Sequence, residues 1–165
     1  LSQAVWVKVS NVLGKLVALQ LGLVLYMALL GGLYAVLPSV NVTIVAGMFV
    51  LAGFCNGAYQ QIPWAMYPDH MDVTRAQSGA AIEGAFSAVW LFGQKLANAL
   101  APAVLGGVLA AVGWQETTVG IVTQLPSAIT MLHISITLIP AAILFVSLLA
   151  LGLVYRPLAK TALGK

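Results

Sequence analysis

Residues 80–112 are AAIEGAFSAVWLFGQKLANALAPAVLGGVLAAV, and this stretch decides the class of fold. It contains only two charged residues, Glu83 and Lys95, and a helix needs about 20 mainly apolar residues to cross a bilayer. As a helix it would be about 50 Å long at about 1.5 Å per residue, so it must tilt, kink at Pro102 or extend beyond the bilayer. We therefore predict a membrane-spanning helix here.

Three further apolar stretches are long enough to cross a bilayer, residues 16–37, 43–66 and 130–155. Prolines, glycines and polar residues fill the gaps between the four stretches, at 38–39, 68–72 and 113–116. The sequence therefore predicts an all-α fold of polytopic transmembrane helices, with residues 1–165 as one membrane-embedded part. Because the chain begins with Leu1 rather than methionine, we expect it to be the C-terminal piece of a longer protein.

The composition of the whole chain agrees with a membrane protein. Hydrophobic residues make up 61% of it and charged residues 7%, whereas a soluble domain carries about 25% charged residues. So few charges cannot cover a water-facing surface, which excludes a soluble enzyme domain and a disordered tail. The net charge of +3 is spread along the chain without a basic patch, so no nucleic-acid partner is expected.

The basic residues indicate how the chain is oriented. Six of them lie outside the predicted spans and on one side of the membrane: Lys8, Lys15, Arg75, Arg156, Lys160 and Lys165. The opposite loops, 38–42 and 113–129, contain no lysine or arginine. Because cytoplasmic loops carry an excess of positive charge, both ends are predicted to be cytoplasmic, in a multi-pass protein of the cell (inner or plasma) membrane.

Polar residues follow one face of each of the two middle helices. In the second span they fall at helical spacing: Asn56, Tyr59, Gln60, Pro63, Trp64 and Tyr67. The third span has a similar stripe: Ser87, Trp90, Gln94, Lys95, Asn98 and Pro102. Because unpaired polar groups are costly in hydrocarbon, the stripes predict either helix-to-helix contacts or a shared polar cavity for a ligand. The first and fourth spans are expected to face lipid.

Lys95 is the residue that most needs a partner. It lies 12 positions after Glu83, about 18 Å along a helix, and a lysine near mid-bilayer costs about 2.5–3.5 kcal/mol on insertion scales. The carboxylates fall in loops or at helix ends: Asp69, Asp72, Glu83 and Glu116. We expect its counter-charge on an acidic residue of a missing part of the protein or on a bound anion; the alternative is a lysine that is neutralised or bonded to backbone carbonyls.

No catalytic or metal-binding set is visible in the sequence. His70 is predicted to be a solvated loop residue and His133 an interfacial one, on opposite sides of the membrane. Neither the zinc-binding HExxH motif nor the phosphate-binding GxxxxGK motif occurs. We therefore expect no enzyme activity, metal or cofactor.

The segment 63–113 contains a set of motifs at fixed spacing: Pro63-Trp64-Ala65-Met66, Asp69, Asp72, Glu83 and Lys95. This set resembles the glycoside–pentoside–hexuronide:cation symporters, the melibiose permease group of the major facilitator superfamily. A weaker match is Gly14-Lys15, which is similar to the loop that enters the ninth helix in that family. The resemblance implies that the chain corresponds to about helices 9–12 of a twelve-helix bundle, in which the tenth and eleventh line the cavity.

The resemblance also implies roles for single residues. Lys95 is similar to the lysine beside the coupling-cation site, near acidic residues of the N-terminal half. Gln60 and Gln94 hold positions that face the sugar, although the family has other residue types there. With Trp64 and Asn98 they are expected to hydrogen-bond to the substrate or stack on it.

Three acidic residues are similar to the cytoplasmic charges that help to close the inner gate of the family: Asp69, Asp72 and Glu83. Members of the family commonly have an arginine where this chain has Ala81. The resemblance therefore implies that one charge pair of the gate is either missing here or replaced by Arg75.

The predicted function is cation-coupled symport of a sugar, glycoside or related hydrophilic solute by alternating access. The expected partners are the solute, a coupling cation (H⁺ or Na⁺), the lipid bilayer and the missing N-terminal half. Two alternatives stay open. One is a transporter of the same fold for a lysolipid or other amphiphile, and the other is a non-transporting sensor or assembly subunit in which the stripes only pack helices.

Overall fold

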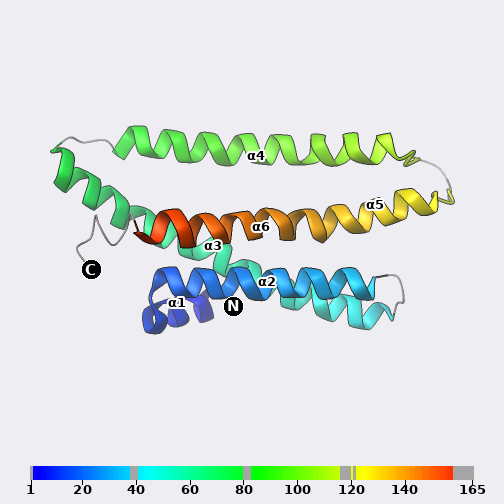
Figure 1. Cartoon of the computed structure of the whole chain (residues 1–165), viewed down its shortest axis with the longest axis horizontal. Helices are drawn as coiled ribbons and strands as arrows, with labels where there is room; N and C mark the ends of the chain where they lie inside the picture. The colour runs from blue at the N-terminus through cyan, green and yellow to red at the C-terminus, as the bar shows by residue number, and fades with distance from the viewer. Residues whose placement is uncertain (1, 38–40, 80–82, 116–119, 121, 158–165) are drawn as a thin grey trace. The chain divides into compact units, whose positions relative to one another are not determined.

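The computed structural model describes residues 2–37, 41–79, 83–115, 120 and 122–157, and these residues form helices without a strand (Figure 1). The elements are α1 (Ser2–Leu13), α2 (Lys15–Val36), α3 (Val42–Ser78), α4 (Glu83–Ala111), α5 (Pro126–Ile136), α6 (Leu138–Ala150) and η1 (Leu151–Tyr155). The last of these, η1, is a short π-helix. The predicted all-α fold is confirmed.

Four helical segments are long and apolar enough to cross a membrane: Lys15–Val36, Val42–Ala76, Glu83–Ala111 and Pro126–Tyr155. They agree in number and approximate position with the four stretches predicted from the sequence. The protein is therefore a multi-pass membrane protein. The start predicted for the third span, residues 80–82, lies outside the described residues.

Helix α3 is longer than predicted. The sequence analysis placed a break at residues 68–72, but the helix continues through both Pro63 and Pro68. Each proline removes one intrahelical hydrogen bond, which membrane helices tolerate when neighbouring groups compensate. The helix ends at Gly79, which has a φ of 65° and donates its N–H to the Arg75 carbonyl, a left-handed cap that glycine adopts without strain.

The fourth span is interrupted by a proline. Pro140 has no N–H for the carbonyl of Ile136, and its ring crowds that carbonyl. The backbone leaves helical geometry at Thr137, with φ −122° and ψ −67°. The span therefore consists of α5, then α6 from the following residue, and finally η1.

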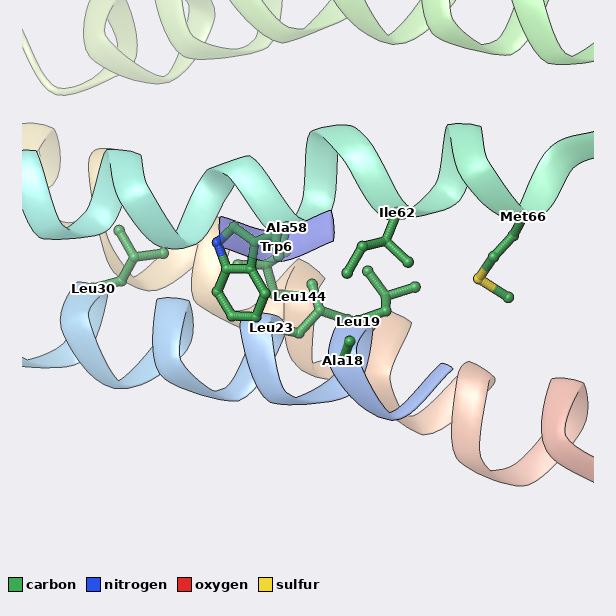
Figure 2. Close-up of a cluster of buried hydrophobic side chains, with 9 residues drawn as sticks. All are labelled: Trp6, Ala18, Leu19, Leu23, Leu30, Ala58, Ile62, Met66 and Leu144. Carbon is green, nitrogen blue, oxygen red and sulfur yellow. The ribbon is translucent and has the colours of Figure 1, made fainter. Parts of the chain in front are cut away.

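The chain divides into two compact units, and the first comprises Leu1–Ala81 and Thr137–Lys165. Its core gathers side chains from α1, α2, α3 and α6: Trp6, Ala18, Leu19, Leu23, Leu30, Ala58, Ile62, Met66 and Leu144 (Figure 2). Small residues bring the helices close, because a Cβ atom on Gly22 would lie 2.4 Å from that of Ala58. This is the packing by which helices associate without water to drive them together.

The second unit, Ile82–Ile136, contains α4 and α5. The Gln124 side chain accepts from the Gln115 N–H at 3.0 Å and donates to the Gln115 carbonyl at 2.7 Å, which ties the end of α4 to the segment before α5. None of the described residues of α4 is buried. Its exposed residues include Val89, Phe92 and Val104, an apolar surface suited to lipid or to another part of a protein rather than to water.

Candidate functional site

Helix α3 carries the first predicted stripe, which we call the α3 stripe: Asn56, Tyr59, Gln60, Pro63, Trp64 and Tyr67. The opposite face of the helix packs into the core of the first unit through Ala58 and Ile62 (Figure 2). Gln60 and Trp64 are exposed, and the Trp64 and Tyr67 rings lie with their centroids 6.1 Å apart. The α3 stripe is therefore presented at the surface of the first unit and is not used in its core.

Pro63 adds a backbone acceptor to this stripe. Because proline lacks an N–H group, the Tyr59 carbonyl has no donor four residues further along the helix. Such carbonyls are tolerated in membrane proteins where they line a cavity or contact other protein groups. An amide, aromatic rings and a backbone carbonyl on one exposed face are suited to the hydroxyl groups of a hydrophilic solute.

Helix α4 carries the second predicted stripe, the α4 stripe: Ser87, Trp90, Gln94, Lys95, Asn98 and Pro102. Gln94, Lys95 and Asn98 are all exposed. Lys95 lies near the middle of this 29-residue helix. Of the carboxylates in the described ranges, none forms an ion pair with Lys95. That its counter-charge lies on another part of the protein or on a bound anion stays a prediction from the sequence.

The two stripes belong to different compact units. The structure brings Gln60 and Trp64 together on one helix, and it brings Gln94, Lys95 and Asn98 together on another. That the two groups share one cavity stays a prediction from the sequence.

Asp69, one of the predicted gate residues, pairs with Lys15. The Lys15 Nζ lies 2.6 Å from Asp69 Oδ2 and also donates to the Ala65 carbonyl at 2.9 Å. Gly14, with a φ of 84°, turns the chain so that Lys15 begins α2. The two side chains are 40% and 55% exposed, so the pair contributes about 0–1 kcal/mol. The sequence analysis uses Lys15 only to orient the chain and predicts no partner for it, although the Gly14-Lys15 match is a signal for this residue.

The other predicted gate residues are not joined to this pair in the described residues. Asp72 lies exposed on α3, in the helix rather than in the predicted loop. Glu83 is the first residue of α4, where a negative charge is favourable beside the helix N-terminus. Arg75 lies in the last turn of α3, and Ala81 lies outside the described residues. A common gate role for the three carboxylates stays a prediction.

His70 makes a contact that the sequence analysis missed. The prediction of a solvated loop residue was wrong, because α3 does not break at Pro68 and His70 lies half-buried on it. Its Nε2 atom is 3.0 Å from the Tyr155 hydroxyl oxygen in η1. The two rings meet edge to face with centroids 5.4 Å apart. Asp69 and His70, adjacent in the sequence, thus contact two different helices.

No group of three or more His, Cys, Asp or Glu side chains in the described part of the chain could hold a metal ion. The described residues offer a polar face on α3, a polar face with a central ammonium group on α4, and a charge pair at the start of α2. The polar faces have the hydrogen-bonding groups to bind a polar solute. The Lys15–Asp69 pair joins α2 to α3 and can form or break.

Comparison with known proteins shows which family the sequence resembles. Residues 1–156 match the protein family described as MFS/sugar transport protein, where MFS is the major facilitator superfamily. The chain is also similar to an uncharacterized symporter of Synechocystis sp. (strain ATCC 27184 / PCC 6803 / Kazusa), with 30% identity over 139 residues, 83% of this chain and 25% of that protein. The chain thus spans about a quarter of the length of this curated relative. No solved structure matches the chain at a significant level.

Proposed function

This chain belongs to the MFS/sugar transport protein family, and from that premise we propose that it is part of a cation-coupled symporter for a sugar, glycoside or related hydrophilic solute. The observation that carries the proposal is Lys95, a charged group near the middle of an apolar helix, on the same exposed face as two amides. A membrane helix retains such a charge at a cost of about 2.5–3.5 kcal/mol, which a purely structural helix has no reason to bear.

In this proposal both stripes face the solute pathway. Gln60 and Trp64 on the α3 stripe offer an amide and an aromatic face, and Gln94 and Asn98 on the α4 stripe offer two further amides. Amides both donate and accept hydrogen bonds, which matches the hydroxyl groups of a sugar. The exposure of all four side chains supports this assignment.

Lys95 couples the cation to the conformation. Its ammonium group and the coupling cation, H⁺ or Na⁺, compete for carboxylates on the remaining part of the transporter. Binding of the cation releases Lys95 from those carboxylates, so occupancy of the cation site shifts the conformational equilibrium. The lack of an ion-pair partner for Lys95 in the described ranges supports this role.

The acidic residues act at the end of the pathway. Asp69, which pairs with Lys15 within this part of the transporter, takes part in the gate that closes one end when the two halves rock about a midplane site. Asp72 and Glu83 take part in the same gate. The ion pair of Asp69 supports this, because an exposed pair worth about 0–1 kcal/mol can form and break during transport.

The test uses the full-length protein in membrane vesicles. Uptake of a panel of glycosides, pentoses and hexuronides is measured under an imposed H⁺ or Na⁺ gradient, and one of these solutes is expected to accumulate. In Lys95→Gln accumulation is lost, while exchange of internal for external solute continues because exchange needs no net coupling. Lys8→Gln, at an exposed position of α1, is the matched control and accumulates the solute normally.

Three results would contradict parts of the proposal. Normal accumulation in Lys95→Gln contradicts the coupling role of the lysine. Uptake of a lysolipid in place of every sugar contradicts the solute class and supports the amphiphile alternative. Failure of the wild-type protein to move any solute under either gradient supports a non-transporting subunit.

A further inference from the structure

We propose that His70 and Tyr155 form a latch that positions the end of α3, residues 69–78, so that Asp69 meets Lys15. We call these residues the gate section. The inference rests on the proposed function, because the gate section carries two of the predicted gate residues. His70 and Tyr155 are positioning residues in this account and do not touch the solute.

The latch and the ion pair hold the gate section from two directions. Asp69 and His70 are adjacent, so their side chains leave the helix about 100° apart. Asp69 contacts Lys15 on α2, and His70 contacts Tyr155 on η1. Two contacts in different directions fix both the tilt and the rotation of a helix end, which a single contact cannot do.

The gate section needs these contacts because two prolines precede it. Pro63 and Pro68 each remove a hydrogen bond from the ladder of α3. Prolines are the usual positions at which a helix bends. Inside the gate section the Thr74 hydroxyl donates to the His70 carbonyl at 2.8 Å, and such a bond to the carbonyl four residues earlier often bends a helix.

The π-helix η1 directs Tyr155 toward α3. Tyr155 is its last residue, and the wider turn of a π-helix changes the direction in which that residue points. Turns of π-helix are rare in proteins, but those that occur are often found at functional sites. Helix α2 lies beside η1, because a Cβ atom on Gly152 would lie 3.9 Å from the Gln20 Nε2, an ordinary van der Waals distance.

The latch is the more durable of the two contacts. The Tyr155–His70 hydrogen bond is partly buried and has the edge-to-face ring contact beside it. The Lys15 and Asp69 side chains are 40% and 55% exposed, and water and salt screen such a pair. We infer that opening the latch frees the gate section, and that the ion pair is lost as a consequence.

The experiment measures the position of the gate section in the full-length protein without solute. Spin labels are attached at two exposed positions, Val12 in α1 and Ala76 in the gate section, after replacement of each by cysteine in a Cys55→Ala background. The ratio of the population with a long distance between the two labels to the population with a short one reports how often the gate section is open. We expect Tyr155→Phe, which keeps the ring, to raise this ratio about threefold to tenfold, the effect of one hydrogen bond.

The partner variants follow from the geometry. His70→Leu should have the same effect as Tyr155→Phe, and the double variant should have no larger effect than either single one, because each residue acts through the other. His70→Gln keeps a polar group near the position of Nε2. Its label distances should therefore stay close to those of the wild-type protein, unlike those of His70→Leu. Tyr34→Phe, the same change of atoms at a half-buried tyrosine of α2, is the control.

Additive effects of Tyr155→Phe and His70→Leu would overturn the latch, as would a Tyr155→Phe effect no larger than that of Tyr34→Phe. Because the distances are measured without solute, either result stands whether or not a sugar is transported. In transport, the latch variants should change the maximal rate and leave KM unchanged. A change in KM alone would instead place the two residues at the solute site.

Discussion

At the scale of single residues, the two lysines of the membrane helices differ in how their charges are balanced. Lys15 begins α2 and has the Asp69 carboxylate 2.6 Å away. Lys95 lies near the middle of α4 and pairs with none of the described carboxylates. A lysine at a helix end reaches water, whereas one at mid-helix must have a partner or bear the desolvation cost. The first is therefore a contact between helices and the second a candidate coupling group.

Exchanging the two charges of the Lys15–Asp69 pair tests whether they interact. Lys15→Asp or Asp69→Lys alone places like charges together and should lower the stability of the purified full-length protein. The double exchange should restore it, with a coupling free energy of about 0.2–1 kcal/mol from a double-mutant cycle of thermal unfolding. The coupling should shrink at high ionic strength. Lys15→Asp combined with Asp72→Lys is the control and should restore nothing; a restoration there would assign the partner to Asp72.

At the scale of helices, the sequence was sufficient for some features of α3 and insufficient for others. Its polar face follows from the spacing of residues such as Gln60 and Trp64, because a helix has a fixed period. Its length does not follow from the sequence pattern, which predicts a stop at Pro68, whereas α3 continues to Ser78. The helix ends at Gly79, which adopts a left-handed cap. A glycine at this place is itself a sequence signal for the end of a helix. The helical backbone hydrogen bonds can continue on both sides of a proline, and tertiary contacts decide whether the helix continues.

Close packing of α2 on α3 can be tested at a glycine. Gly22→Ala places a methyl group 2.4 Å from the Ala58 Cβ and should destabilise the protein by about 1–3 kcal/mol through overpacking. Gly31→Ala on the same helix meets nothing within 4 Å and is the matched control. Thermal unfolding in detergent compares the two. Equal stability of both variants would mean that the helices are less closely packed than described.

The connection between α4 and α5 offers a second test on helices. Gln124→Ala removes both hydrogen bonds to the Gln115 backbone, and amide hydrogen exchange at residue 115 should become about tenfold faster, the effect of about one net hydrogen bond. Gln115→Ala is the matched control, because only the backbone of residue 115 takes part. If Gln124→Ala leaves the exchange rate at residue 115 unchanged, or if Gln115→Ala accelerates it equally, the two hydrogen bonds do not join these segments.

At the scale of the whole molecule, the four spans follow from hydropathy, but contacts between distant residues do not. The His70–Tyr155 bond joins residues 85 positions apart, and no periodicity links them. Likewise the described residues include no ion-pair partner for Lys95, so its coupling role rests on the cost of a charge at mid-helix and on the family resemblance. The chain spans about a quarter of its curated relative, and the exposed α4 is suited to contact with further parts of such a protein.

The orientation of the molecule is predicted by its basic residues. Cysteines introduced at Lys8 and Arg156, in a Cys55→Ala background, should react with a membrane-impermeant reagent only from the cytoplasmic side, because positively charged loops remain inside. A cysteine at Gln115 should react only from the outside. Labelling of intact cells and of inverted vesicles distinguishes these cases. Reaction of all three positions from one side would contradict a four-span topology.

The central claim is that the protein couples a cation to a sugar through Lys95, and solute-driven cation entry tests it most directly. The transported solute is added to de-energised vesicles that contain the full-length protein, and entry of H⁺ or Na⁺ is recorded together with solute entry. The account predicts that the cation enters with the solute in the wild-type protein, and that in Lys95→Gln solute equilibrates without cation entry. Solute entry without a cation in the wild-type protein, or unchanged cation entry in Lys95→Gln, would contradict it.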